Sequence, residues 1–216
     1  MTFLSWSVLY LQKFLNINIL QQIITQCTNT SLTEWLAFLF GVIQVVLALK
    51  NKPLNFYAGI LSVSLYIYVF YTVELYAESL LNGYYLIVSI AGIFLWSKKE
   101  KEKSLPITHT KKHEWIKASA LFIALFILLA FILKTYTKSN VPYADALVTA
   151  LAWIGTWLMI QRKLEHWLVL NLSNTFAIPL LIYKELELTA LLTLIYFVIA
   201  ILGYCKWEQT MKLKQP

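Results

Sequence analysis

The stretch that decides the fold occurs twice in this chain, as LNGYYLIVSIAGIFLW at residues 81–96 and as LTLIYFVIAILGYCKW at residues 192–207. The two copies lie 111 residues apart, and the same offset lays Gly41–Trp96 over Ala152–Trp207 without a gap. A fixed offset of this length indicates an internal duplication. The identical pairs least open to chance are Lys52/Lys163, Glu74/Glu185, Tyr85/Tyr196, Gly92/Gly203 and Trp96/Trp207.

The composition places both copies in a membrane. Of the 216 residues, 59% are hydrophobic and only 13% are charged, whereas a soluble domain carries about 25% charged residues. So few charges could not cover a surface against water, but helices that face lipid do not need them. The net charge of +7 comes from loops between apolar runs, a pattern typical of membrane topology rather than of nucleic-acid binding.

Seven apolar segments approach the length of about 20 residues that a spanning helix needs. They are Leu32–Leu49, Asn55–Tyr71, Ala77–Trp96, Ile116–Leu133, Ala144–Gln161, His166–Tyr183 and Leu188–Tyr204. The duplication groups them as three helices, one linking helix and three helices. Because the single helix restores the direction of the chain, the two halves run parallel, as in the sugar facilitators called SWEETs. The fold class is therefore an all-α membrane protein, most typical of a transporter, with a duplicated membrane enzyme or scaffold as alternatives.

The transporter domain is predicted over residues 32–207, with repeat one at 32–97, the linker helix at 116–133 and repeat two at 144–207. Residues 1–31 mix apolar and polar side chains and are predicted to form an amphipathic segment at the membrane interface; an eighth span is the alternative. Residues 208–216 are predicted to be a cytoplasmic tail. The oligomeric state is left open, a homo-oligomer included.

The basic residues predict the orientation. With seven spans, the side that holds the N-terminus carries four of them, and the other side carries fourteen, including Lys50, Lys52, Arg162, Lys163 and Lys206. The positive-inside rule places the fourteen in the cytoplasm. We therefore expect a multi-pass protein of the cell inner membrane, with its N-terminus outside and its C-terminus in the cytoplasm.

Polar and aromatic side chains within the spans are the candidates for a substrate site. They recur at helical spacing on equivalent faces of both repeats, and the set comprises Gln44, Asn82, Tyr85, Trp153, Trp167, Leu170, Asn171, Asn174 and Tyr196. Amides hydrogen-bond the edge of a flat ring and aromatic side chains stack on its face, which suits a heterocyclic or cationic solute. Helix–helix hydrogen bonding is the alternative role for each amide. Trp96 and Trp207, at span ends, are interpreted as interfacial anchors.

No catalytic residue, metal ligand or cofactor site is predicted. No Asp, Glu, Lys or Arg falls at the middle of a span, whereas a proton- or ion-coupled carrier usually keeps one there. This favours facilitated diffusion and disfavours hydrolytic chemistry. His109 and His113 have the i, i+4 spacing of a metal pair, but further ligands do not accompany them.

The residues from about Glu34 to Trp207 resemble the PnuC family of vitamin transporters. The resemblance is carried by Leu81–Trp96, by Trp157–Trp167 continuing through Asn174, and by Leu194–Trp207. The family has the same three-plus-one-plus-three arrangement and takes up nicotinamide riboside, with relatives for thiamine and riboflavin. The resemblance implies facilitated diffusion into the cytoplasm, followed by trapping through a cytoplasmic kinase that need not touch the transporter.

The family's sixth helix carries a Trp-x-x-Trp-x-x-x-Asn motif that lines the substrate site. Trp167 and Asn174 match its first and last residues, whereas Leu170 stands in place of the second Trp. The resemblance thus implies nicotinamide riboside as the first candidate substrate, with thiamine a serious competitor because one stacking surface is missing. A sugar facilitator is the third candidate.

Overall fold

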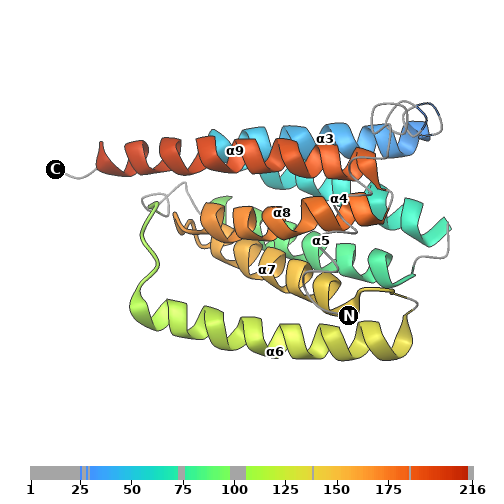
Figure 1. Ribbon diagram of the computed structural model, residues 1–216. Coiled ribbons are helices and arrows are strands. Elements are labelled where there is room, and N and C mark those ends of the chain that lie inside the picture. The colour runs from blue at the N-terminus through green and yellow to red at the C-terminus, as the bar shows by residue number, and fades with distance from the viewer. Residues whose placement is uncertain are drawn as a thin grey trace.

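The computed structural model describes Thr25, Thr28 and residues 30–72, 76–97, 106–137, 139–184 and 186–213, in which seven helices account for most of the chain (Figure 1). The helices are α3 (Leu32–Leu49), α4 (Leu54–Thr72), α5 (Tyr76–Ser97), α6 (Lys112–Tyr136), α7 (Pro142–Ile160), α8 (His166–Tyr183) and α9 (Glu187–Lys212). The predicted order of seven helices is confirmed. Most of the predicted amphipathic segment, residues 1–31, lies outside the described residues.

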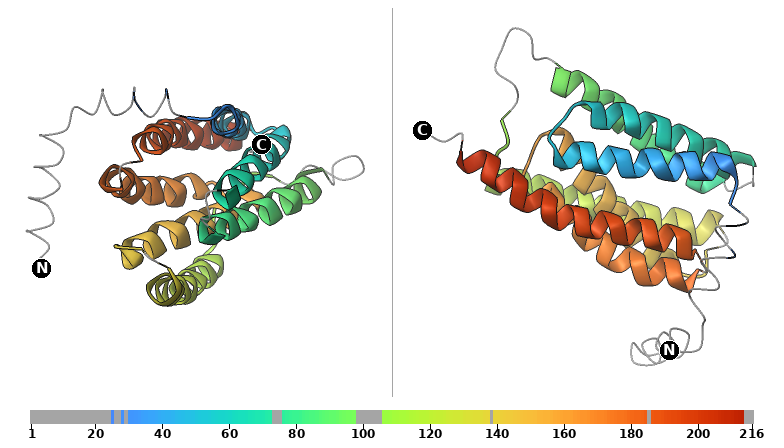
Figure 2. Two further views of the ribbon diagram at one scale, coloured as in Figure 1. Left: turned by 90° about the vertical axis from the view of Figure 1, so that its right-hand side faces the viewer. Right: turned by 90° about the horizontal axis from the view of Figure 1, so that it is seen from above.

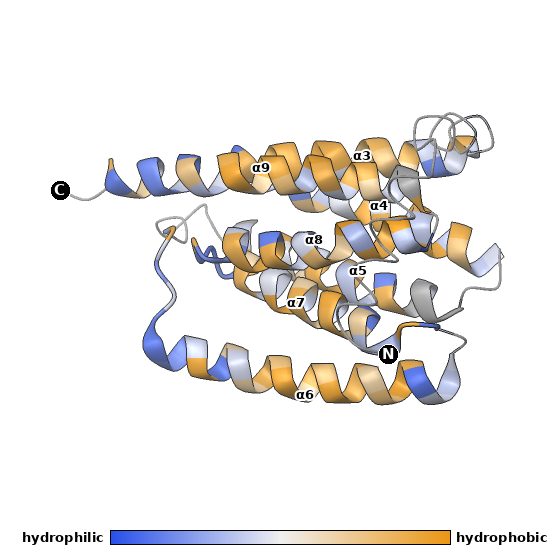
Figure 3. Ribbon diagram, in the orientation of Figure 1, coloured by the Kyte–Doolittle hydropathy of each residue, from blue (hydrophilic) through white to orange (hydrophobic). Residues whose placement is uncertain are grey.

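Helix length and composition fit a membrane. α3, α4, α6, α7 and the part of α9 from Thr189 to Lys212 are long and apolar enough to cross a bilayer, and α5 contains a shorter apolar stretch, Leu81–Trp96. α8 is less apolar because it carries Asn171 and Asn174, but its 18 residues match α3 in length and it packs between α7 and α9. The apolar middles and polar ends of the helices are visible in Figure 3. The chain is a multi-pass membrane protein.

Six of the helices form a closed ring, in the order α3, α4, α5, α7, α8, α9 and back to α3. The left view of Figure 2 looks along the helices and shows this arrangement. Repeat one contributes α3–α5 and repeat two contributes α7–α9. The repeats meet at two equivalent places, where α5 contacts α7 and where α9 contacts α3. We call these two contacts the α5–α7 seam and the α3–α9 seam. α6 lies outside the ring against α7.

The 111-residue offset is reproduced in atomic detail. The Ser62 hydroxyl donates to the carbonyl of Ala37 at 2.8 Å, and the equivalent Ser173 donates to the carbonyl of Val148 at the same distance. Asn51 and Arg162, which are also equivalent, both have a φ of 53° in the loops α3–α4 and α7–α8. A left-handed residue in the same place of both loops shows that the halves share one backbone turn.

Both loops lie at the same end of the ring as the last turns of α5 and α9. We call this the basic end, because Lys50, Lys52, Arg162, Lys163 and Lys206 lie there. α9 continues beyond the predicted end of its span at Tyr204 and takes in residues 208–212 of the predicted tail. Lys206 and Glu208 end the apolar run without interrupting the helix, since both are good helix formers.

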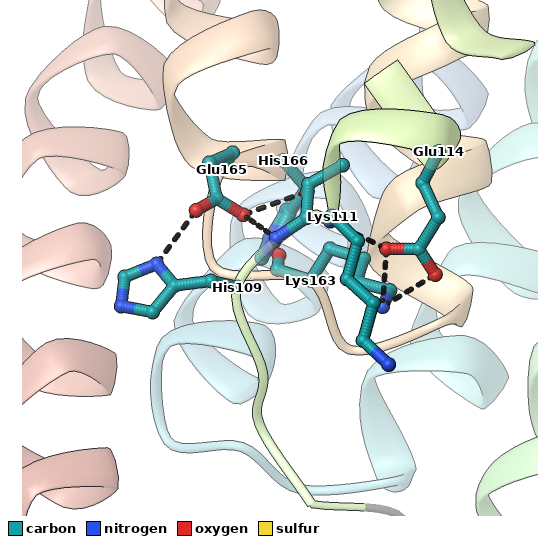
Figure 4. Close-up of polar contacts among 7 residues, drawn as sticks. His109, Lys111, Glu114, Lys163, Glu165 and His166 are labelled. Carbon is teal, nitrogen blue, oxygen red and sulfur yellow. Dashed lines mark hydrogen bonds and ion pairs between the residues drawn. The ribbon is translucent and has the colours of Figure 1, made fainter. Parts of the chain in front are cut away.

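A short segment, residues 106–111, crosses the basic end before α6 begins, and we call it the strap. Its Thr108 N–H donates to the carbonyl of Arg162, and its Thr108 carbonyl accepts from the Leu164 N–H at 3.0 Å. The Nδ1 of His109 lies at hydrogen-bond distance, 2.7 Å, from a carboxylate oxygen of Glu165, a contact that Figure 4 shows. The backbone N–H and hydroxyl of Thr110 donate to the same carboxylate at 2.8 and 2.7 Å. The strap is therefore bound to the α7–α8 loop.

The contacts of the strap with Glu165 should weaken at low pH. Burial alone would raise the pKa of Glu165, but hydrogen bonds from Thr110 and His109 outweigh burial and hold the pKa below its usual value of 4.5. A lowered folded-state pKa adds stability above pH 4.5 that is lost as the pH falls through the folded-state pKa. Protection of the Thr110 N–H from hydrogen exchange should persist down to pH 4.5 and disappear below it. The N–H of Lys52, bonded to the carbonyl of Leu47, is the control and should stay protected; parallel loss at both positions would contradict the prediction.

Candidate substrate site

The candidate site is a layer at mid-height of the ring, and its two halves differ in which helix carries a large side chain and which carries a glycine. In repeat one, Gly59 of α4 leaves room for Gln44 of α3: a Cβ at Gly59 would lie 3.0 Å from the Gln44 amide and 3.2 Å from the Ser89 hydroxyl. In repeat two the equivalent of Gln44 is Gly155, and a Cβ there would lie 2.6 Å from the Leu170 side chain. Repeat one thus fills this contact with a polar amide, whereas repeat two fills it with an apolar Leu.

On the α7 side of the layer, aromatic rings meet across the seam. Tyr84 stacks on Trp153 with 4.2 Å between ring centroids, and its hydroxyl donates to the Trp153 carbonyl at 3.0 Å. Tyr85 lies edge-on to Tyr84, with 5.6 Å between their centroids. The predicted residues Tyr85 and Trp153 therefore each contact Tyr84, which sequence reasoning missed.

Several polar groups of this layer are not used by the protein itself. The Trp153 Nε1 and the Asn171 Oδ1 are buried without a hydrogen-bond partner among the described residues. The half-buried side chain of Asn174 has no hydrogen bond within the described part of the chain either. An unpaired buried donor or acceptor costs about 1–3 kcal/mol. A bound solute with its own donors and acceptors would remove that cost.

The remaining predicted residues lie around this layer. Asn82 and Tyr196 are half-buried, and the Tyr196 hydroxyl lies directly against the backbone of Gly41, so it lines the α3–α9 seam. Trp167 lies apart from the layer, at the basic end. It is 2% exposed and packs edge-on against Trp207 at 5.7 Å. Trp167 can therefore form the floor below Leu170, one helical turn away.

Trp96 and Trp207 are not interfacial anchors, and that prediction is wrong. They are 1% and 0% exposed, and each indole N–H donates to a carbonyl of the other repeat. Trp96 donates to Ile160 at 3.0 Å and Trp207 to Ala48 at 3.1 Å. A Trp near a span end is usually an anchor, but here the helix ends converge and offer a carbonyl inside the ring.

The layer carries no formal charge. Among the described residues, the Asp, Glu, Lys and Arg side chains of helices α3–α9 lie toward the helix ends, as Asp145 does near the start of α7, where Lys184 and Ser139 contact its carboxylate at 2.6 Å. The layer can therefore hold a neutral or cationic aromatic solute through stacking and amide hydrogen bonds. It offers no Lys or Arg for an anion.

A closed ring of six helices around a polar, uncharged layer defines a membrane transporter. Residues 31–209 match the family described as nicotinamide mononucleotide transporters, and the chain belongs to this family. It is 30% identical over 199 residues to the nicotinamide riboside transporter PnuC of Neisseria mucosa, a match that spans 83% of this chain and 74% of that protein.

A more distant relative and a solved structure agree with this assignment. The nicotinamide riboside transporter PnuC of Escherichia coli is 20% identical over 207 residues, which cover 83% of this chain and 86% of that one. The crystal structure described as the vitamin B3 transporter PnuC superposes with a TM-score of 0.71 at 25% identity, covering 100% of this chain and 94% of that chain. The predicted family resemblance is confirmed.

Proposed function

We propose that this chain carries nicotinamide riboside across the membrane by facilitated diffusion. The observation that carries the proposal is the mid-height layer: among the described residues, the indole N–H of Trp153 and the side-chain oxygen of Asn171 are buried and unpaired, and the Trp153 ring stacks on Tyr84. A flat pyridinium ring with a carboxamide has a face for stacking, a positive charge for the ring quadrupole, and both a donor and an acceptor at its edge. The relatives' names point to the same solute.

The riboside suits this layer better than the mononucleotide of the family's description. A phosphate brings a charge of about −1.5 to −2, and burying such a charge without a cation is expensive. Because the described parts of the seven helices place no Lys or Arg at mid-height, the layer favours the uncharged ribose. Thiamine remains the second candidate, since it too is a cationic heterocycle and Leu170 removes one stacking surface.

The proposed topology follows the charges. The basic end faces the cytoplasm by the positive-inside rule, so the N-terminus lies outside and the C-terminus inside, in the cell inner membrane. We retain residues 32–207 as the transporter domain, with residues 1–31 at the interface. A cytoplasmic kinase that phosphorylates the solute would make net uptake one-way, without contact with the carrier. A homo-oligomer is compatible with this scheme but is not needed by a ring that closes within one chain.

Two measurements test the proposal. Thermal unfolding of the full chain with nicotinamide riboside, nicotinamide mononucleotide, thiamine, riboflavin and glucose should show the largest stabilisation with the riboside, since a ligand bound only to the folded state raises its stability. Proteoliposomes without an ion gradient should exchange labelled riboside for unlabelled riboside. A larger shift with thiamine would reassign the substrate, and exchange that requires a proton or sodium gradient would contradict facilitated diffusion.

Replacing Leu170 with Trp should tighten nicotinamide riboside binding by about two- to tenfold, the range that an aromatic contact of 0.5–1.5 kcal/mol gives. The reason is that residue 170 lies in the mid-height layer, next to Gly155. Titration calorimetry measures the effect. Leu172→Trp is the matched control, because Leu172 is 48% exposed on the outer face of the same helix. Equal effects of the two variants would mean that residue 170 does not contact the solute.

A further inference from the structure

The basic end of the ring is closed by a cluster of large side chains. We call it the closing cluster, and its members are Phe56, Trp96, Arg162, His166, Trp167 and Trp207, each at most 2% exposed. Trp96 lies 4.9 Å from Phe56 and 6.0 Å from Trp207 between ring centroids. A solute in the mid-height layer cannot pass this end unless the cluster separates, because a packed interior leaves no channel.

Each seam is held at this cluster by one hydrogen bond from an equivalent Trp, although the two acceptors differ by one position in the repeat. Trp96 of α5 donates to the Ile160 carbonyl of α7, and Trp207 of α9 donates to the Ala48 carbonyl of α3. Because Trp96 and Trp207 occupy the same position of the two repeats, the two seams would be equally strong if nothing else distinguished them. The rest of the structure does distinguish them.

The α5–α7 seam has additional contacts. The Arg162 guanidinium lies 4.0 Å over the ring of Trp96, and Tyr84 bonds and stacks with Trp153. At the α3–α9 seam the equivalents of Arg162, Trp153 and Tyr84 are Asn51, Val42 and Ile195. These residues carry no guanidinium, indole or hydroxyl, so the same contacts cannot form there.

The strap strengthens the same half. It holds the α7–α8 loop through the backbone of Thr108 and through Glu165. Lys163 adds an ion pair with Glu114 of α6 at 2.7 Å, which Figure 4 shows beside the contact between Glu165 and His109. Among the described residues, the equivalent loop of repeat one carries no such strap. Lys52 there is exposed, whereas its equivalent Lys163 is 8% exposed. The strap therefore fixes the loop that presents Arg162 to Trp96.

We propose that the gate at the basic end is one-sided: the α3–α9 seam opens with Trp207 as its gate residue, while the α5–α7 seam and the strap stay closed. Helices α3 and α9 are in backbone contact over more positions than α5 and α7, but among the described residues the α3–α9 seam has no counterpart of the Arg162–Trp96 contact, the Tyr84–Trp153 pair or the strap. Its basic end therefore costs less free energy to open, and gates are drawn from such low-stability regions. The inference rests on the proposed transport function, because it assigns the exit of the carried solute.

Distances between spin labels in the full chain test the proposal. The chain, with Cys27 and Cys205 replaced by Ser, is placed in lipid nanodiscs and labelled at one of two pairs. Lys50→Cys with Lys206→Cys spans the α3–α9 seam, and Leu95→Cys with Gln161→Cys spans the α5–α7 seam. Without ligand and with nicotinamide riboside, we expect a second, longer distance only for the pair at residues 50 and 206. A longer distance at residues 95 and 161, or at both pairs equally, would overturn the proposal.

Matched substitutions sharpen the test. Trp207→Phe removes one hydrogen bond but keeps a ring, and it should raise the ratio of long to short distances at residues 50 and 206 about two- to tenfold. Trp96→Phe should leave the pair at residues 95 and 161 closed, because the other contacts of that seam remain. Glu165→Gln and Thr110→Val combined with Trp96→Phe remove the Glu165 contacts of the strap as well as the Trp96 hydrogen bond, and this triple variant should produce a longer distance at that pair. An unchanged ratio in Trp207→Phe, or an unchanged distance in the triple variant, would contradict the one-sided gate.

The distances between spin labels test the gate, and the transport assay tests the substrate, so the two results can contradict their proposals independently. Label distances in the absence of any solute report on the seams alone, so they test the gate even if nicotinamide riboside is not the substrate. Failure of riboside exchange in proteoliposomes with the α3–α9 seam opening as expected would remove the proposed substrate. Normal exchange with the α5–α7 seam opening instead would remove the gate.

Discussion

Asn174→Ala is expected to bind nicotinamide riboside about five- to a hundredfold more weakly than the unmodified chain while folding normally. Asn174 is half-buried on α8 and makes no hydrogen bond within the described residues, so its removal breaks no hydrogen bond in that part of the chain. Losing it deprives the solute of one buried partner, which costs about 1–3 kcal/mol. Titration calorimetry measures the affinity, and thermal unfolding without ligand measures the fold.

The neighbouring Thr175→Ala is the control for this variant. Thr175 is exposed on the outer face of α8, and its hydroxyl bonds only within the helix, to the Asn171 carbonyl at 2.9 Å. Affinity for the riboside should therefore be unchanged. If Asn174→Ala binds as tightly as Thr175→Ala, Asn174 does not belong to the site. If Asn174→Ala unfolds at a clearly lower temperature than Thr175→Ala, its role is structural.

Gly203→Ala is expected to destabilise the protein by up to about 3 kcal/mol, the upper part of the range for overpacking a filled core. A Cβ at this position of α9 would lie 2.6 Å from the indole of Trp167. The indole cannot retreat, because it is 2% exposed and Trp207 and His166 pack against it. The midpoint of thermal unfolding measures the loss.

Gly83→Ala is the matched control on α5. Nothing lies within 4 Å of a Cβ built there, so the substitution gains the higher helix propensity of Ala, up to about 1 kcal/mol. The two variants make the same chemical change and should shift the unfolding midpoint in opposite directions. A similar shift for both would mean that helix propensity, rather than the contact with Trp167, decides the effect at Gly203.

Much of the fold could be predicted from the sequence, because hydropathy sets the helices and the duplication sets their grouping. The predicted bounds of Leu32–Leu49 and His166–Tyr183 coincide with α3 and α8. The ends of α6 and α9 were underestimated because charged residues mark the end of an apolar run but continue a helix. At the start of α6, the Lys111 N–H donates to the Glu114 carboxylate at 2.7 Å and supports the polar first turn.

The site was less accessible to sequence reasoning. Amide and aromatic positions could be placed on helix faces, but contacts between repeats depend on how the ring closes. Tyr84 was missed because Tyr85 matches Tyr196 in the repeat, whereas the equivalent of Tyr84 is Ile195. Trp96 and Trp207 lie at span ends, so the sequence predicts interfacial anchors. Their hydrogen-bond partners cannot be recognised in the sequence, because they are backbone carbonyls of the other repeat, 64 and 159 residues away. The identity of a side chain does not show whether the backbone carbonyl of its residue will accept a hydrogen bond.

The large residue and the glycine of one contact are exchanged between the repeats: Gln44 packs on Gly59 in repeat one, and Leu170 packs on Gly155 in repeat two. This exchange limits the substitutions by which one repeat could become like the other. Gly155→Gln alone would collide with Leu170, and Leu170→Gly alone would leave a cavity. Both changes together would reproduce the pair found in repeat one, so their effects are strongly non-additive. Either single change would therefore give a destabilised protein on the way to the other repeat's pair of residues. The two repeats therefore keep different residue pairs at the same contact, and the binding layer between them stays asymmetric.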